Sequence, residues 1–128
     1  MTFDGMYSVV RESESGARWE GVSEVIKGRV VEKGVWTFKD GKRTEGTIEM
    51  QFGSGEEADV LKVIQPFAEH EYLLVESEMG MVGQYECGED MYYVWCGEPT
   101  KDGWQMRFEV EGPNKNGWQD VVYERKLS

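Results

Sequence analysis

The single histidine, His70, is the residue on which a catalytic triad, a cysteine–histidine pair or a histidine-based metal site would have to depend. It lies between two glutamates, beside a predicted strand, in a segment that we expect to be a solvated bend. The cysteines, Cys87 and Cys96, do not form a Cys-x-x-Cys pair, so the sequence holds no zinc or redox motif of that kind. We therefore predict no catalytic residues, no metal and no cofactor.

Acidic residues gather in two segments that we expect to be solvated loops. They are Glu56, Glu57 and Asp59, and Glu86, Glu89 and Asp90. Neither group has the spacing of a calcium loop, which places oxygen ligands at fixed intervals around a turn glycine. A glycosidase-like pair of carboxylates depends on a separation in space that the sequence does not fix. An enzyme that acts in a cavity therefore stays open as a hypothesis, without assigned residues.

The charge of the chain limits its partners. It has 14 basic and 25 acidic residues and a net charge of −11, which repels phosphate backbones and anionic membrane surfaces. We predict no nucleic-acid and no membrane partner. The acidic surface either keeps the protein soluble or offers loops that bind a basic protein partner. No apolar run approaches the ~20 residues of a membrane helix and the first residues do not resemble a secretion signal, so we expect a cytoplasmic protein.

The segment 34–52 has the pattern of a β-hairpin with one wet face. Asp40-Gly41 is typical of hairpin turns, and the residues on both sides of it alternate with a period of two. The large apolar side chains of this hairpin share one face: Trp36, Phe38, Ile48, Met50 and Phe52.

Similar alternating segments follow one another along the chain. After a first strand that begins at residue 4, we expect strands over 17–26, 29–33, 60–64, 72–75, 81–87, 91–97, 104–110 and 118–126. Turns or bends separate them at 27–28, 33–34, 69–71 and 88–90. Segment 17–26 would also fit an amphipathic helix, but the glycines and β-branched residues around it favour a strand.

The spacing of the strands predicts the fold class. About ten or eleven short strands, at intervals of roughly 8–12 residues, are typical of a sandwich or a barrel. Short connections favour a meander, and a meander removes its exposed edges by closing into a barrel. We predict a single all-β domain over residues 1–128, an antiparallel up-and-down β-barrel of about 8–11 strands.

The hairpin centred on residue 89 is expected to have a three-residue loop. This register places Tyr85, Tyr93 and Trp95 on one face. It also separates Cys87 from Cys96 by several residues along the strands, which is too far for a disulfide. We expect two free, packed thiols.

The aromatic and methionine side chains of successive strands would converge on one side of the sheet. Inside a closed barrel they either fill the interior or line a cavity for one small apolar or aromatic ligand. In the second case, tyrosine hydroxyls and an arginine would orient the ligand. The candidate cavity residues are Trp36, Phe38, Met50, Phe52, Tyr85, Tyr93, Trp95, Trp104, Met106, Phe108, Tyr123 and Arg125.

The two ends of the chain resemble those of a lipocalin-like (calycin) β-barrel. Lipocalins begin with Gly-x-Trp in the first strand, and an arginine from the last strand packs across that indole and closes the base of the barrel. Here Gly5-Met6-Tyr7 stands in place of Gly-x-Trp, and Arg125 stands in place of the closing arginine. The resemblance implies a closure in which the guanidinium packs on an aromatic face.

The opening residues also resemble two other groups of lipocalin-like proteins. Met1 to Tyr7 is similar to the start of fatty-acid-binding proteins, but their Arg-x-Tyr carboxylate clamp appears here in reverse order, as Tyr123-Glu124-Arg125. The short bacterial lipocalin-like regulators that restrain type III secretion share the Asp-Gly-x-Tyr-Ser start. These resemblances imply either a non-enzymatic barrel that binds a small hydrophobic or aromatic molecule, or a regulatory adaptor with a basic protein partner. Formation of a homodimer stays open as a hypothesis.

Overall fold

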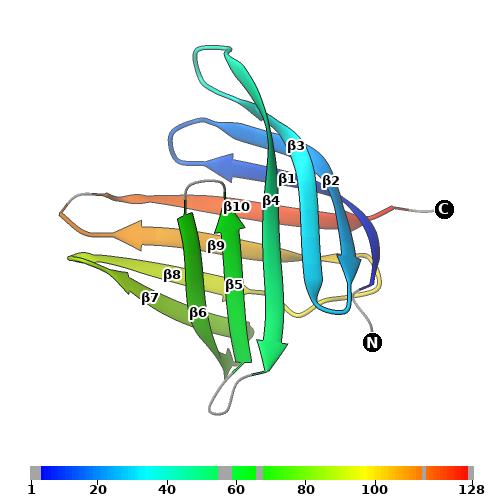
Figure 1. Ribbon diagram of the computed structural model, residues 1–128, viewed down its shortest axis with the longest axis vertical. Helices are drawn as coiled ribbons and strands as arrows, with labels where there is room; N and C mark the ends of the chain where they lie inside the picture. Colours follow the sequence, from blue (N-terminus) through cyan, green and yellow to red (C-terminus); the bar gives the residue numbers. More distant parts are fainter. Residues whose placement is uncertain (1–3, 55–58, 66–67, 114, 127–128) are drawn as a thin grey trace.

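The computed structural model describes residues 4–54, 59–65, 68–113 and 115–126 (Figure 1). Within these residues ten strands follow one another: β1 (Gly5–Ser13), β2 (Arg18–Ile26), β3 (Arg29–Thr37), β4 (Arg43–Ser54), β5 (Asp59–Gln65), β6 (Ala68–Ser77), β7 (Gly80–Cys87), β8 (Asp90–Cys96), β9 (Gly103–Glu111) and β10 (Gly117–Arg125). Each strand pairs antiparallel with the next, and β1 pairs with β10, so the sheet closes. The predicted all-β, up-and-down barrel is confirmed. No helix in these ranges is long and apolar enough to cross a membrane.

The barrel has two ends that differ in their connections. The terminal end carries the start of β1, the end of β10, the β2–β3 and β6–β7 turns and the β8–β9 connection. The hairpin end carries the β1–β2, β3–β4, β7–β8 and β9–β10 turns. In Figure 1 the β3–β4 tip lies at the top and the β7–β8 and β9–β10 tips lie at the left, so the strands twist strongly around the barrel.

Local backbone chemistry explains where two of the hairpins turn. Lys27 and Gly28, between β2 and β3, have positive φ values of 48° and 82°. Two consecutive positive φ values are required in the two-residue turn that matches the twist of the strands. Between β3 and β4, Gly41 has a φ of 89°. The Asp40 carboxylate accepts a hydrogen bond of 2.9 Å from the Lys42 amide. Both turns lie where the sequence predicts them, and 17–26 is a strand rather than a helix.

The turn predicted at 33–34 is wrong, because β3 continues to Thr37. Gly34 is paired with Gly21 on one side and Gly46 on the other, so three glycines lie in a row across β2, β3 and β4. The Trp19 ring covers this row: a Cβ on Gly34 would lie 2.8 Å from its Cε2 atom. Gly34 therefore makes room for an indole inside the barrel and does not end the strand.

The bend predicted at 69–71 is also wrong, because these residues belong to β6. His70 is paired with Val63, a buried residue of β5, and faces the interior with it. Its ring stacks on Tyr85, with centroids 4.9 Å apart and planes 19° apart, and it also contacts Tyr92 at 4.9 Å. Since two tyrosine rings shelter it, His70 is half-buried and not the solvated side chain that we expected.

The β7–β8 hairpin has a two-residue loop, Gly88-Glu89, instead of the predicted three. Tyr85 consequently pairs with Tyr92, and Tyr93 and Trp95 face the outside of the barrel. A shift of one residue reverses the direction of every side chain in a strand. The shift also moves Asp90 into the first position of β8, where it is buried and not part of a solvated loop.

The two thiols are free, as predicted, but only one of them is packed. Cys96 is buried on the inner face of β8, whereas Cys87 is exposed at the end of β7. Cys87 is paired with Asp90 and Cys96 with Met81, so the two cysteines lie at different levels of the β7–β8 hairpin. The expectation of a packed Cys87 is corrected.

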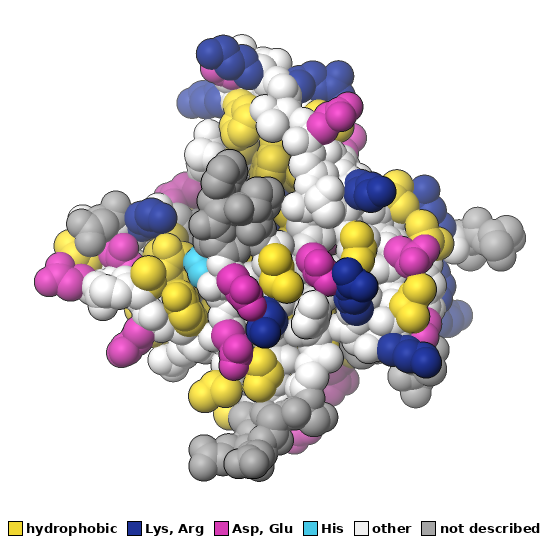
Figure 2. Space-filling view, in the orientation of Figure 1, with side chains coloured by type: hydrophobic (Ala, Val, Ile, Leu, Met, Phe, Trp, Pro, Cys, Tyr) yellow, Lys and Arg dark blue, Asp and Glu magenta, His cyan; other side chains and the backbone are white. Residues whose placement is uncertain are grey.

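Large side chains fill the middle of the barrel. Each one stabilises the fold by about 1.5–3 kcal/mol relative to exposure to water. The most buried apolar residues include Tyr7, Val9, Trp19, Met50, Leu61, Tyr72, Met106, Val121 and Tyr123. On the face shown in Figure 2, charged side chains of both signs lie among small hydrophobic patches on the outside.

Candidate functional site

An arginine closes the base of the barrel at the terminal end. The Arg125 guanidinium carbon lies 4.9 Å from the centre of the Tyr7 ring, and its Nη2 donates a hydrogen bond of 2.6 Å to the Tyr7 hydroxyl. Nε and Nη1 donate to the backbone carbonyls of Lys101 and Asp4. Gly5 has a φ of 144°, which favours glycine, and a Cβ there would lie 2.6 Å from Nη1. The arginine closure that the lipocalin resemblance implies is confirmed.

Trp104, at the start of β9, is held between two tyrosines. Its ring packs edge-on against Tyr7, with centroids 4.8 Å apart, and stacks on Tyr123, with centroids 4.1 Å apart and planes 8° apart. Each tyrosine is in turn hydrogen-bonded to an arginine, Tyr7 to Arg125 and Tyr123 to Arg11. Trp104 is therefore a rigid wall, because both of its neighbours are fixed.

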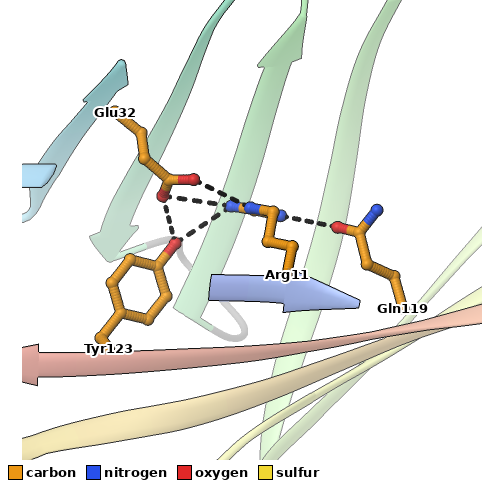
Figure 3. A network of polar contacts seen from close by, with 4 residues as sticks. All are labelled: Arg11, Glu32, Gln119 and Tyr123. Carbon is orange, nitrogen blue, oxygen red and sulfur yellow. Dashed lines mark hydrogen bonds and ion pairs between the residues drawn. The ribbon is translucent and has the colours of Figure 1, made fainter. Parts of the chain in front are cut away.

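A buried ion pair lies deeper in the barrel (Figure 3). Arg11 of β1 and Glu32 of β3 are 1% and 0% exposed, and Arg11 Nε and Nη2 donate to Glu32 over 2.8 and 3.2 Å. Nη2 also donates to the Tyr123 hydroxyl, and Nη1 donates to the Gln119 side-chain carbonyl. The Tyr123 hydroxyl donates to Glu32. Both charges are thus neutralised within the network.

The network shifts the proton affinity of its members. Burial raises the pKa of Tyr123 well above its usual value, so the hydroxyl keeps its proton. Burial tends to lower the pKa of Arg11, but the charges and hydrogen bonds of Tyr123 and Glu32 outweigh this and raise it. The guanidinium therefore stays charged, with Glu32 as its counter-ion. It is not available to pair with an anionic ligand.

A cavity of about 480 Å³ lies in the terminal end of the barrel. Its apolar lining comes from inward-facing positions on seven strands: Val25, Val30, Phe52, Leu74, Met81, Cys96 and Trp104. Five of these side chains are buried. The rim is exposed and polar, with Asp59, Glu76, Ser77 and Glu98. The cavity is therefore an apolar recess that opens to water through an acidic rim.

The lining of the cavity combines an apolar floor with carboxylates at the rim. No lysine, arginine or histidine is among the described residues that line it. Burial raises the pKa of the Cys96 thiol to about 12, so the thiol stays protonated and is a poor nucleophile at neutral pH. No group of three or more His, Cys, Asp and Glu residues in the described ranges has the geometry to hold a metal.

The candidate cavity residues divide into five groups. Phe52 and Trp104 line the cavity, and Met50, Met106 and Tyr123 face inward and are buried in the filled middle. Nearer the hairpin end, Tyr85, Phe108 and Trp36 pack against the core, and the exposed Phe38 stacks on Trp36. Tyr93 and Trp95 face outward, and Arg125 forms the closure.

Sequence reasoning missed part of the lining and the whole ion pair. Val25, Val30 and Leu74 belong to strands whose alternation is clear, so their inward direction could have been found. Arg11 and Glu32 also lie at inward positions of β1 and β3. Charged side chains are rarely buried unless they are paired, so a charged residue in a strand is normally expected to face outward. A buried ion pair is therefore not recognised from either residue alone.

A second hollow lies on the outside of the barrel. It is a groove of about 510 Å³ across β6, β7, β8 and β9. Its apolar lining is Leu73, Val75, Val82, Tyr93 and Trp95. Leu73 and Val75 are 60% and 55% exposed. The large side chains that the expected register placed inside thus form a surface feature.

His70 is not part of the cavity. It lies nearer the hairpin end among Tyr85 and Tyr92, and burial, with a smaller effect of the Lys115 charge, lowers its pKa. The neutral ring therefore prevails near pH 7. Its ring contacts with Tyr85 and Tyr92 give it a packing role.

Two solved structures resemble this barrel. The first is an S-type phycobiliprotein lyase from Guillardia theta, with a TM-score of 0.61 and 10% identity, which covers 98% of this chain and 89% of that one. The second is a de novo designed fluorescence-activating β-barrel, with a TM-score of 0.50 and 11% identity, which covers 97% and 94%. These likenesses show the fold alone, and they agree with the closed antiparallel barrel of ten strands described above.

Comparisons of sequence identify the chain only at the level of a family. No curated protein matches it. A family model described as a family of unknown function (DUF6314) matches residues 2–125.

Proposed function

Since this chain belongs to DUF6314, a family of unknown function, we propose its role from the barrel itself: it binds one small apolar or aromatic molecule in the cavity at the terminal end. The observation that carries the proposal is the cavity of about 480 Å³ with a buried apolar floor. Ligand sites are typically recesses of about 300–1,000 Å³ that are mostly apolar and largely preformed.

The rigid wall supports the same role. Tyr7 and Tyr123 fix the Trp104 ring, so this side chain does not have to become ordered when a ligand binds. When fewer side chains have to be ordered on binding, less conformational entropy is lost, so more of the free energy of the apolar contacts remains as affinity. The filled middle of the barrel sets the floor, which limits the occupant to one small molecule.

The solved neighbours add limited support. One is named as a phycobiliprotein lyase and the other as a fluorescence-activating barrel. Two barrels of this fold are thus named for an activity, and one fold can carry unrelated functions. The ligand class for this chain is inferred from its own cavity.

The proposal is tested by titration with N-phenyl-1-naphthylamine, a neutral apolar probe whose emission rises in a dry site. We expect one saturable site. In the variant Met81→Trp, a large ring on the cavity wall fills the space and weakens binding at least tenfold. Val82→Trp is the matched control, because Val82 is the next residue and lines the outer groove. Absence of saturable binding to the folded protein, or equal binding by both variants, contradicts the proposal.

A second candidate is a regulatory adaptor with a basic protein partner, and the outer groove favours it. Leu73 and Val75 are exposed apolar side chains there, and the outward charges beside them on β6 and β7 are acidic: Glu69, Glu71 and Glu86. The basic residue of the groove lining, Arg107, is already ion-paired with Glu109 and Asp120. An amphipathic basic segment of another protein fits this combination. The net charge of −11 opposes a second copy of the chain.

This candidate is tested with an amphipathic lysine–leucine peptide titrated against isotope-labelled protein. Leu73→Glu should abolish the chemical-shift changes at the groove and high salt should weaken them. Ile26→Glu is the control, because Ile26 is an equally exposed apolar residue on β2, at 52% exposure. Equal loss in both variants contradicts a specific groove. A dimer that only Leu73→Glu dissociates would show that the occupant is a second copy.

A further inference from the structure

We infer that the cavity at the terminal end selects neutral or cationic apolar molecules and excludes anionic ones. The inference rests on the proposed function and adds the charge class of the ligand. Three carboxylates, Asp59, Glu76 and Glu98, stand on the rim above an apolar floor. A ligand whose apolar body fills the recess must place any polar group at this rim.

The charged side chains of the rim are carboxylates, which accept hydrogen bonds, and two of the donors there are already used. The hydroxyl of Ser77, the neutral polar side chain among them, donates a 3.0 Å hydrogen bond to the Gly80 carbonyl. The Gly97 amide donates to the Gln105 carbonyl. A ligand carboxylate or sulfonate needs donors, whereas an ammonium or hydroxyl group can donate to the three carboxylates.

The arginines near the cavity do not change this balance. Arg125 donates to Tyr7, Lys101 and Asp4 and forms the closure. Arg11 lies in the filled middle with Glu32 as its counter-ion. The described lining has no basic residue, so an anion at the rim would meet negative charge without a compensating cation.

The size of the selectivity follows from Coulomb's law. A unit charge at roughly 6–8 Å from each of three carboxylates, in a medium close to water, changes affinity by about tenfold in total at low salt. Exposed charges are screened, so the effect should fall to about twofold near 0.5 M salt. A neutral ligand should show neither effect.

The experiment compares three naphthalene ligands with the same ring and different charge: 1-naphthylmethylammonium, 1-naphthalenemethanol and 1-naphthylacetate. Each displaces N-phenyl-1-naphthylamine from the wild-type protein at 20 mM and 500 mM salt. At low salt we expect the cation to bind about tenfold more tightly than the alcohol, and the anion about tenfold more weakly. The differences should shrink at high salt.

A charge-removal variant locates the effect at the rim. Asp59→Asn with Glu76→Gln and Glu98→Gln should bring the three affinities within about twofold of one another, with the alcohol unchanged. The control removes three exposed carboxylates from the hairpin half of the barrel, with Glu45→Gln, Glu86→Gln and Glu111→Gln. It has the same net charge and should keep most of the selectivity.

The outcomes separate this inference from the proposed function. If the alcohol binds and the anion binds as tightly as the cation, the charge inference is overturned and the cavity function stands. If the control variant loses selectivity as fully as the rim variant, the net charge of the protein and not the rim is responsible, and the inference is again overturned. If no ligand binds, both the function and the inference fail.

Discussion

Replacement of Arg11 by methionine should destabilise the barrel by about 3–5 kcal/mol, because it leaves a buried carboxylate without its cation. Arg11 and Glu32 are almost fully buried and share hydrogen bonds of 2.8 and 3.2 Å. A domain of this size is typically stable by about 5–15 kcal/mol, so the expected loss is a large fraction of the total. With a urea m-value of about 2 kcal/mol/M, the midpoint should fall by roughly 2 M.

The pH dependence of the Arg11→Met variant gives a second readout. Protonation of Glu32 would remove the uncompensated charge, and a buried acid without a cation favours its protonated form. A group that holds its proton more tightly in the folded state adds stability at low pH and loses it as the pH rises. The variant should therefore be closer to wild type at pH 5 than at pH 8.

Urea unfolding followed by tryptophan fluorescence measures these effects, with two matched variants. The double variant Arg11→Met with Glu32→Leu removes both charges and should recover most of the loss, except for about 1–3 kcal/mol from the unpaired Tyr123 hydroxyl. Arg18→Met breaks an exposed ion pair with Glu20 and should have a much smaller effect. A midpoint for Arg11→Met equal to that of wild type, or a double variant as unstable as the single one, would refute the reasoning.

Two further predictions follow from packing and burial. Gly34→Ala should lower stability by about 1–3 kcal/mol through overpacking, because its Cβ would lie 2.5 Å from the Glu20 carbonyl oxygen and 2.8 Å from the Trp19 ring. Gly46→Ala, whose Cβ would lie 3.5 Å from the same ring, should be tolerated; equal midpoints in thermal unfolding would contradict this. A disulfide reagent such as dithiobis(nitrobenzoate) should modify Cys87 quickly and Cys96 slowly, because Cys87 is exposed and burial raises the pKa of Cys96 to about 12; a rapid phase that persists in Cys87→Ser would be the opposite result.

The sequence predicts the fold more fully than the site, and individual residues show why. Alternation is a local signal, so Trp104, Met106 and Phe108 were assigned to one face and lie on one face. The expected register places Tyr93 and Trp95 on the wrong face, because one residue more or less in a hairpin loop reverses the direction of the side chains in the next strand. No local signal in the sequence fixes the length of the loop.

The buried charges were hidden for a different reason. Arg11 and Glu32 are 21 positions apart in the chain. Each residue, taken alone, is predicted to be an outward polar residue. His70 was assigned to a bend because its two glutamate neighbours look solvated. They face outward while His70 faces inward, as alternation within β6 requires. The contact between Arg11 and Glu32 depends on how β1 and β3 lie across the barrel, which periodicity does not encode, whereas the inward direction of His70 follows from alternation once β6 is known to be a strand.

Because the middle of the barrel is filled with buried side chains, we infer that the cavity has one opening, at its acidic rim. Met106 is paired with Cys96 of the lining, and Met106, Tyr123 and Arg11 are each 1% exposed. A molecule must therefore leave by the opening through which it entered, and an occupied recess has no route for displacement from behind. Exchange of one ligand for another would then depend on the dissociation rate of the first, however much of the second is present.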